Sequence, residues 1–570
     1  MKRSTYVLII ILIFFILITA TCVSFFYFAT ARPPAVKTHS YLEINLSGEI
    51  QEYPIPDLFL TMFPGMRPLS LHKLWMNIRK AKADRRIETL FLRIGYLECG
   101  WAKINELREA ILNFRESGKK AYAFLEEGPD LNKEYYLATA CDRIILQPTS
   151  SLTINGLGGY IPFLKNTLKK LGIEAEFEHV EEFKTAANIL TEEKFTPAHR
   201  EMMESIYGDY FSHYLKVVAE ARGKSEKEVK KLIDRAFFYG QEAVKSGLVD
   251  DLLYEDQVIE LMKGEEEKIN RISYEAYSRI KPSSLGLNRG KKIALIYGSG
   301  PIHTGEGYYQ TMGSRTIARW LKKAREDASI KAVVFRVDSP GGSAVGSDII
   351  WREVVLTKKE KPFVVSMSDV AGSGGYWVSM AADKIVAQPQ TLTGSIGVLG
   401  GKFNLASLYE KIGVTAEKLT FGKNADIFST FRSFTPEERR LLKKELLWVY
   451  DQFLSKVAQG RNISREDVDA IGRGRVWTGN QAKELGLVDE IGGLSRAIEL
   501  AKEQAGIPPE EEVKIVVFPP KISLFQALFG KKEARVNLNF KPKLDRLIDY
   551  LEILGRERIW AIMPLWTAPQ

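Results

Sequence analysis

A chain of 570 residues with 45% hydrophobic residues can bury large cores and is expected to form at least two domains. The net charge of +9 arises from 80 basic residues interleaved with 71 acidic ones. Because the sequence has no basic stripe and no aromatic platform, nucleic-acid binding is not expected, although the positive balance suits an anionic membrane. Three scattered cysteines exclude a disulfide framework and a cysteine metal cluster.

The N-terminus contains 23 consecutive uncharged residues, positions 7–29. A helix of this length crosses a hydrocarbon core of about 30 Å. A cleaved signal peptide is the alternative, but its apolar region usually runs about 7 to 15 residues. Lys2 and Arg3 precede the stretch, which favours a cytoplasmic N-terminus and an extracytoplasmic body. Residues 1–37 are therefore predicted to be a membrane anchor with a juxtamembrane linker.

The remaining chain carries one pattern twice. The matching pairs are RRIETLFLRI (85–94) with ASIKAVVFRV (328–337), ACDRIILQP (140–148) with AADKIVAQP (381–389), and YGQEAVKSGLVDDL (239–252) with TGNQAKELGLVDEI (478–491). Their offsets are 243, 241 and 239 positions, a drift that short loop insertions explain. We therefore predict two tandem repeats, residues 38–260 and 291–515, joined by a connector over 261–290. The tail, 516–570, has an apolar stripe that we expect to pack on the body or on a neighbouring copy.

Short β-branched runs alternate with amphipathic stretches of helical length in both repeats. In the second repeat, strands are expected at AVVFRV (332–337) and PFVVSM (362–367), each followed by a turn and then a helix. This alternation predicts βαβ units, an α/β class and a mainly parallel sheet. Function is expected in the loops at the carboxyl ends of the strands, where both glycine-rich turns of this repeat fall.

Ser373, in the stretch SDVAGSGGYWVS (368–379), has the setting of a nucleophile. It ends a turn and opens a predicted helix, where unpaired backbone NH groups favour developing negative charge. The NH of Gly374, with one from Gly341 or Gly342 in the preceding turn, could form an oxyanion hole, because glycine lets a carbonyl approach the backbone closely. A plain N-cap role for Ser373 is the alternative.

The candidate base is a lysine, since no histidine follows position 303. In a gapless register at offset 241, Ser373 faces Asn132, and Lys184 faces Ala425. One repeat thus has the serine without the lysine, and the other has the lysine without the serine. This complementarity predicts a single site shared between the repeats.

A lysine acts as a base only where burial or a nearby cation lowers its pKa from about 10.4. The segment EHVEEFKTAANIL supplies apolar neighbours for Lys184, but Glu181 and Glu182 would raise its pKa if they pointed inward. A solvated surface position for Lys184 is the alternative. Lys423 lies two residues before the register position, so an insertion or deletion could bring it into play instead.

At these residues the chain resembles signal peptide peptidase A in its long, tandem-repeat form, a family of membrane-anchored serine proteases of the Clp protease and crotonase superfold. The resemblance covers essentially the whole chain, and its most specific motifs are RVDSPGGS (336–343), SGGYWVS (373–379) and TLTGSIGV (391–398). It implies a Ser-Lys dyad with Ser373 as nucleophile and Lys184 as general base. It further implies that Ser395 orients the lysine amine, and that Gly342 and Gly374 carry the oxyanion NH groups.

The resemblance also implies the setting of the reaction. The substrates would be signal-peptide remnants or other apolar peptides, and no metal or other cofactor would be needed. The protein would be a homo-oligomer, a homotetramer in the family's manner, anchored once in a bacterial inner membrane with its catalytic body on the periplasmic side. Two other readings remain open: an acyl-thioester-binding crotonase-like protein in which Ser373 only caps a helix, and a non-catalytic scaffold.

Overall fold

The computed structural model describes residues 13–15, 17, 18, 21, 34–53, 69–126, 128, 130–307, 310–519 and 559–564. Most of the predicted membrane-spanning stretch, 7–29, lies outside these residues. Among the helices that are described, none combines the length and the apolar character needed to cross a membrane.

The first repeat is built on a parallel sheet. Its strand order is β10 (Asn270–Ser273), β1 (Ser40–Gln51), β3 (Ile87–Glu98), β4 (Lys120–Leu125), β5 (Arg143–Leu146) and β9 (Asp251–Leu252), and β2 (Leu69–Ser70) pairs with β1. Strands β6 (Ser151–Thr153) and β8 (Phe237–Tyr239) form a separate pair. β10 lies within the predicted connector, so that part of the connector is an edge strand of this sheet.

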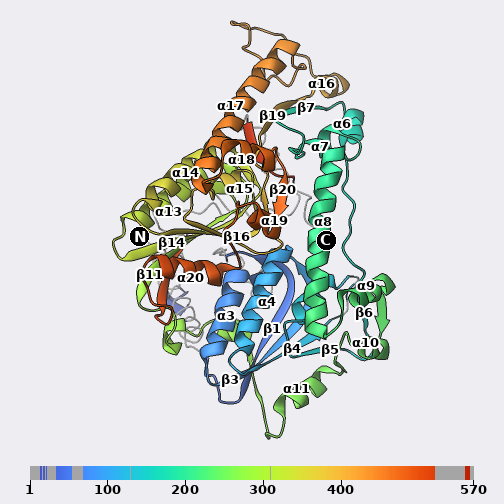
Figure 1. The fold of residues 1–570 in the computed structure, drawn as a ribbon, viewed down its shortest axis with the longest axis vertical. Helices are drawn as coiled ribbons and strands as arrows, with labels where there is room; N and C mark the ends of the chain where they lie inside the picture. The colour runs from blue at the N-terminus through green and yellow to red at the C-terminus, as the bar shows by residue number, and fades with distance from the viewer. Residues whose placement is uncertain are drawn as a thin grey trace, which may run out of the picture.

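The helices of this part of the chain cover the sheet (Figure 1). They are α3 (Leu71–Ala83), α4 (Trp101–Arg115), α5 (Asn132–Ala138), α6 (Lys165–Leu171), α7 (Asn188–Thr191), α8 (Pro197–Arg222), α9 (Glu226–Arg235), α10 (Gln241–Lys245), α11 (Glu255–Lys263), α12 (Tyr274–Tyr277) and the 3-10 helix η2 (Pro282–Leu285).

The second repeat has a sheet of the same order. Strands β22 (Val513–Phe518), β11 (Lys291–Ser299), β14 (Ile330–Ser339), β16 (Phe363–Gly372), β17 (Lys384–Ala387) and β21 (Glu490–Ile491) follow one another as β10, β1, β3, β4, β5 and β9 do in the first repeat. In addition, β18 (Leu392–Gly394) pairs with β16, and β20 (Val476–Thr478) pairs with β18. The helices are α13 (Ser314–Glu326), α14 (Ala344–Lys358), α15 (Gly374–Trp377), α16 (Ala406–Lys411), α17 (Pro436–Arg461), α18 (Arg465–Ile471), α19 (Gly479–Glu484) and α20 (Leu494–Gln504).

The helix bounds of the two repeats coincide at the sequence offsets. α3 and α13, and α4 and α14, begin and end at positions 243 apart, and α8 and α17 do so at 239. The two long helices, α8 and α17, begin in the same way. The hydroxyls of Thr196 and Thr435 cap their N-termini, and a proline follows each cap. Both helices end at a left-handed residue, Gly223 or Asn462. The two repeats therefore share one fold.

A third sheet joins the repeats. Its order is β13 (Met312–Gly313), β12 (Ile302–His303), β15 (Gly341–Ser343), β23 (Ile559–Ile562), β19 (Leu399–Asn404) and β7 (Glu174–His179). β7 comes from the first repeat and runs antiparallel to β19 of the second over six residue pairs. This sheet is the structural element that brings the segment after β7 toward the second repeat.

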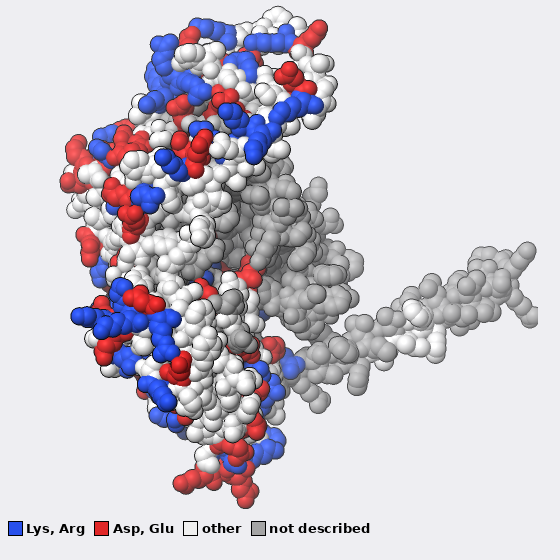
Figure 2. Space-filling view, turned by 90° about the vertical axis from the view of Figure 1, so that its right-hand side faces the viewer, with Lys and Arg blue, Asp and Glu red and all other residues white. Residues whose placement is uncertain are grey.

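The charges of the molecule are mixed. Basic and acidic side chains alternate at both ends of the face shown in Figure 2, and the described surface between them is largely uncharged. This distribution agrees with the interleaved charges of the sequence.

Candidate active site

Ser373 lies at the carboxyl end of β16, which runs through to Gly372 where the sequence predicted a turn from position 368. Its φ of 55° is left-handed, a costly conformation for a serine. A hydrogen bond from its NH to the carbonyl of Gly394, 2.7 Å, helps to hold it. The helix that follows, α15, is only four residues long, and the serine hydroxyl makes no capping hydrogen bond to it. The side chain is therefore left for another partner.

That partner is Lys184, whose Nζ donates to Ser373 Oγ at 2.7 Å. The same amine donates to the carbonyl oxygen and to the Oγ of Ser395, each at 3.0 Å. All three residues are fully buried. Ser395 also has a left-handed φ, 50°, and its NH donates to the carbonyl of Arg475 at 2.7 Å. The structure thus brings together the serine, the lysine and the second serine that the sequence singled out.

Backbone hydrogen bonds hold the segment that contains Lys184 against the second repeat. Beyond the β7–β19 pairing, the NH of Val180 donates to Val398 and the NH of Phe183 donates to Arg473, both at 3.1 Å. A Cβ on Gly474 would stand 2.5 Å from the backbone nitrogen of Lys184, so the two chain segments lie in direct contact. Only a glycine allows this approach at position 474.

Burial lowers the pKa of Lys184 well below its ordinary value, because the charged form loses its hydration without gaining a counter-ion. Glu181 and Glu182 do not oppose this shift. Both are exposed, and Glu182 lies 3.6 Å from the guanidinium of Arg473. The backbone of Glu181 has a left-handed φ of 63°.

Three glycines crowd beside Ser373. Gly341 and Gly342 have φ values of 97° and 148°, which only glycine adopts readily. A Cβ on Gly374 would stand 3.0 Å from Gly341 Cα, and one on Gly342 would stand 2.1 Å from the carbonyl oxygen of Ile302. Other atoms of the chain already lie where a side chain at these three positions would begin, so only glycine fits at each of them.

Lys423 and the other two serines of the stretch 368–379 have partners of their own. Lys423 is 71% exposed and pairs with Glu437 at 2.7 Å, so it is not part of the buried cluster. The hydroxyl of Ser368 bonds to Glu52, and that of Ser379 donates to the carbonyl of Gly375. No group of histidine, cysteine or acidic side chains in the described ranges is arranged to hold a metal ion.

Sequence reasoning missed a buried ionic cluster behind this site. Lys103 of α4 lies 2.8 Å from Asp338 and 3.1 Å from Asp369, at the ends of the two strands that lead into the glycine turn and Ser373. Arg336 of β14 pairs with Glu52 at 2.9 Å and Glu106 at 2.8 Å. The signal was present in the motif RVDSPGGS, but its partners come from the first repeat, hundreds of positions away.

Several known proteins have sequences similar to that of this chain. The family model described as peptidase family S49 matches residues 113–269 and 356–508, one segment in each repeat. The chloroplastic serine protease SPPA of Arabidopsis thaliana is 38% identical over 90% of this chain and 76% of its own. Protease 4 of Haemophilus influenzae is 33% identical over 77% of this chain and 73% of its own.

Shorter relatives match part of the chain. A putative signal peptide peptidase SppA from Enterococcus faecium is 33% identical over 46% of this chain and 78% of its own. Among solved structures, a mutant of ClpP1 from Listeria monocytogenes aligns with 36% of this chain and 94% of its own, at 14% identity and a TM-score of 0.25.

An α/β fold that occurs twice and these relatives define the class of the protein: it is a serine protease, and its substrates are peptides. The chain belongs to peptidase family S49, whose domain it contains in two copies.

Proposed function

We propose that the protein is a membrane-anchored serine endopeptidase that degrades signal-peptide remnants or other apolar peptides with a Ser-Lys dyad split across its repeats. In this proposal residues 38–260 supply the base, Lys184, and residues 291–515 supply the nucleophile, Ser373. The observation that carries the proposal is the 2.7 Å contact between Lys184 Nζ and Ser373 Oγ in a fully buried setting. An amine with a lowered pKa beside a hydroxyl is the arrangement that nucleophilic catalysis requires.

The reaction would be acyl transfer. Neutral Lys184 takes the proton of Ser373, and the hydroxyl oxygen attacks the carbonyl carbon of a peptide bond. The NH groups of Gly374 and Gly342 stabilise the oxyanion, and Ser395 orients the amine. Lys184 then gives the proton to the departing amine, and a water molecule hydrolyses the acyl-enzyme by the same route. The chemistry proceeds with the side chains of this chain and water.

Covalent labelling tests the dyad. The full-length chain in detergent is treated with a fluorophosphonate and its intact mass is measured, beside Ser373→Ala, Lys184→Ala and Lys423→Ala. We expect the wild type and Lys423→Ala to gain one adduct at Ser373, and the other two variants to lose at least about 1,000-fold in labelling rate and peptide hydrolysis. Labelling of Lys184→Ala at the wild-type rate would refute the lysine as base.

The membrane anchor and the periplasmic location belong to the same proposal. They are supported by the uncharged stretch 7–29 and by Lys2 and Arg3 before it. We expect the full-length protein to stay with the membrane pellet after alkaline extraction, and a chain lacking residues 1–37 to be released. Release of both would contradict an anchor.

The proposal also includes self-association into a homo-oligomer, which by family resemblance is a homotetramer. Its support is an asymmetry between equivalent helices: on α4, Ala102 and Glu106 are 1% and 4% exposed, whereas their α14 counterparts Val345 and Ile349 are 62% and 40% exposed. α4 packs on the second repeat, so the matching face of α14 suits the first repeat of another copy.

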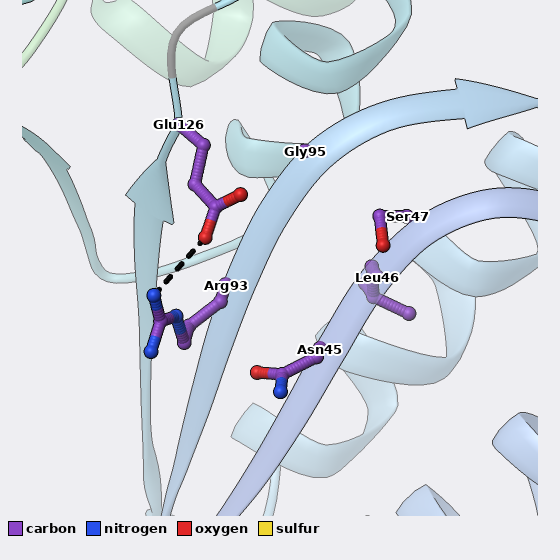
Figure 3. A pocket seen from close by; sticks show the side chains of 6 residues that line it. All are labelled: Asn45, Leu46, Ser47, Arg93, Gly95 and Glu126. Carbon is purple, nitrogen blue, oxygen red and sulfur yellow. Dashed lines mark hydrogen bonds and ion pairs between the residues drawn. The ribbon is translucent and has the colours of Figure 1, made fainter. Parts of the chain in front are cut away.

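In this proposal, a hollow in the first repeat receives the exposed face of α14 from another copy. Asn45, Arg93 and Glu126 line a hollow of about 230 Å³, with the ion pair of Arg93 and Glu126 on one wall (Figure 3). We expect a Val345→Glu, Ile349→Glu double variant to lower the molar mass measured by light scattering, and Leu447→Glu on α17 to leave it unchanged. An unchanged mass in both would contradict this interface.

A further inference from the structure

Helix α4 of the first repeat begins against β16, the strand that leads to Ser373 (Figure 1). Its N-cap residue, Gly100, has no side chain to accept the free backbone NH groups at the helix start. The carboxylate of Asp369 in β16 accepts two of them, from Gly100 at 3.0 Å and from Lys103 at 2.9 Å. A Cβ on Gly100 would stand 2.3 Å from the carboxyl carbon of Asp369, so only glycine allows this contact. A side chain of the second repeat therefore caps a helix of the first.

The side chain of Lys103 links the same carboxylate to the neighbouring strand. Its Nζ lies 3.1 Å from Asp369 and 2.8 Å from Asp338 of β14. Asp338 also accepts a hydrogen bond from the NH of Val370 in β16 at 3.2 Å. Burial disfavours the charged amine, but Asp338 and Asp369 outweigh it and hold the pKa of Lys103 well above its ordinary value. Lys103 thus stays charged and joins the ends of β14 and β16.

The register between β14 and β16 shifts at the position that Lys103 reaches. The paired residues advance from 367 to 371 in β16 while they advance from 337 to 339 in β14. Residues 368–370 therefore lie opposite the single residue Asp338. A bulge of this kind bends a strand and changes the direction of the side chains that follow it. The pairing resumes only two residues before Ser373, so the shift sets how the strand delivers the serine.

The equivalent strands of the first repeat are arranged differently. At the offset of 243, Gly95 occupies the position of Asp338 and offers no side chain to a cation. Glu126 occupies the position of Asp369 and pairs with Arg93 of its own repeat at 3.2 Å. β3 and β4 pair in one continuous register up to the end of β4. The register shift thus occurs in the repeat on which α4 docks.

We propose that Lys103 is a positioning residue for the reaction of Ser373. This inference rests on the proposed function. By holding Asp338 and Asp369 together, Lys103 fixes the shifted part of β16, and with it the left-handed backbone of Ser373 and the glycine turn that follows β14. It acts through the two strands and not on the reacting atoms. The first repeat then supplies two lysines to the site, Lys184 as the base and Lys103 as the support of the nucleophile.

Steady-state hydrolysis of a fluorogenic peptide by the full-length chain in detergent tests the inference. We expect Lys103→Met to lower kcat by about 10- to 100-fold with little change in KM, and to slow fluorophosphonate labelling of Ser373 by a similar factor. Lys80→Met is the matched control. Lys80 is also a buried lysine, 1% exposed, but it donates to the carbonyl oxygens of Tyr277 and Ile280. Its loss should lower the free energy of unfolding and leave kcat unchanged.

A double variant covers the case in which Lys103→Met does not fold. Lys103→Met with Asp338→Asn removes one buried charge of each sign, and the asparagine oxygen can still accept the NH of Val370. Because the link between the strands is gone, we expect this variant to fold, as judged by circular dichroism, and to keep the low kcat.

The outcomes separate this inference from the proposed function. Wild-type kcat in folded Lys103→Met, or in the double variant, overturns the positioning role and leaves the dyad standing. Equal losses of kcat in Lys103→Met and Lys80→Met also overturn it, because a general loss of stability would then explain both. A wild type that neither labels nor hydrolyses peptides removes the proposed function and this inference with it.

Discussion

Lys184 shows how one residue's burial sets its chemistry. The amine lies within hydrogen-bond distance of three oxygen atoms, and none of its partners among the described residues is acidic, so burial acts on its pKa unopposed. The sequence placed this lysine by its register against Ala425, but it did not show where Glu181 and Glu182 point. In the structure both glutamates are exposed, and Glu181 has a left-handed φ that is uncommon for this residue type.

The buried amine makes stability depend on pH. Because the folded pKa lies well below 10.5, the unfolded chain binds one more proton than the folded chain at pH values between the two. The stability of the wild type relative to Lys184→Met should therefore rise with pH in this window, by up to about 1.4 kcal/mol per pH unit. Urea unfolding at about pH 8 and about pH 10 measures this.

Lys423→Met is the control for that series. The side chain is 71% exposed, so its unfolding free energy should follow the wild type at both pH values. Parallel pH profiles for wild type and Lys184→Met would mean that the buried lysine keeps its proton.

Ser395 tests the positioning of the amine. Removing its hydroxyl in Ser395→Ala or Ser395→Gly should lower kcat by about 10- to 100-fold with little change in KM, because the amine loses one of its acceptors. Glycine accepts the φ of 50° without strain, so equal losses in both variants would assign the effect to the hydroxyl. Ser246→Ala, which removes a turn bond in the first repeat, should leave kcat unchanged.

Among the elements, β7 and β19 decide whether the site exists. They come from different repeats and are not counterparts under the repeat offsets, so the internal repetition did not predict their pairing. The sequence did predict strands β14 and β16 and the helix that follows each, because hydrophobic alternation is a local signal. It placed the end of β16 too early, since SDVAG continues as a strand once neighbouring strands supply backbone partners.

Gly401 tests this pairing. A Cβ there would stand 2.1 Å from the carbonyl oxygen of Glu176 in β7. Gly401→Ala should therefore push β7 away from β19 and lower the rate of fluorophosphonate labelling at Ser373, while circular dichroism stays close to that of the wild type. Gly208→Ala in α8 has no atom within 4 Å and should keep full labelling. Full labelling of both variants would contradict the role of this contact.

For the whole molecule, the buried ionic cluster fastens the repeats together. Arg336 is 1% exposed and bonds to Glu52 and Glu106, which belong to the first repeat. Its counterpart in the first repeat, Arg93, is 28% exposed beside a hollow (Figure 3). Equivalent arginines thus have different surroundings, because the second repeat is covered by the first at this point and the first repeat is not covered by any described part of the chain.

Replacing either arginine by methionine should show this difference. Arg336→Met leaves two buried carboxylates without their cation, and we expect it to lower the free energy of unfolding by about 3–5 kcal/mol. Arg93→Met should cost less than about 1 kcal/mol, because its ion pairs are partly exposed. Urea unfolding of both variants measures the two values, and equal costs would contradict the proposed fastening role.

The sequence by itself determined the repeated α/β fold and the candidates Ser373, Lys184 and Gly374, because internal repetition, local periodicity and glycine-rich turns are all encoded within short stretches. The motifs that resemble the family added Ser395 and the choice of Gly342. Only the tertiary structure decided that Lys184 loses its water, that Glu181 and Glu182 face outward, and that residues 559–563 lie against the glycine turn. Each of these depends on packing between segments far apart in the chain, and burial is a property that no single segment carries.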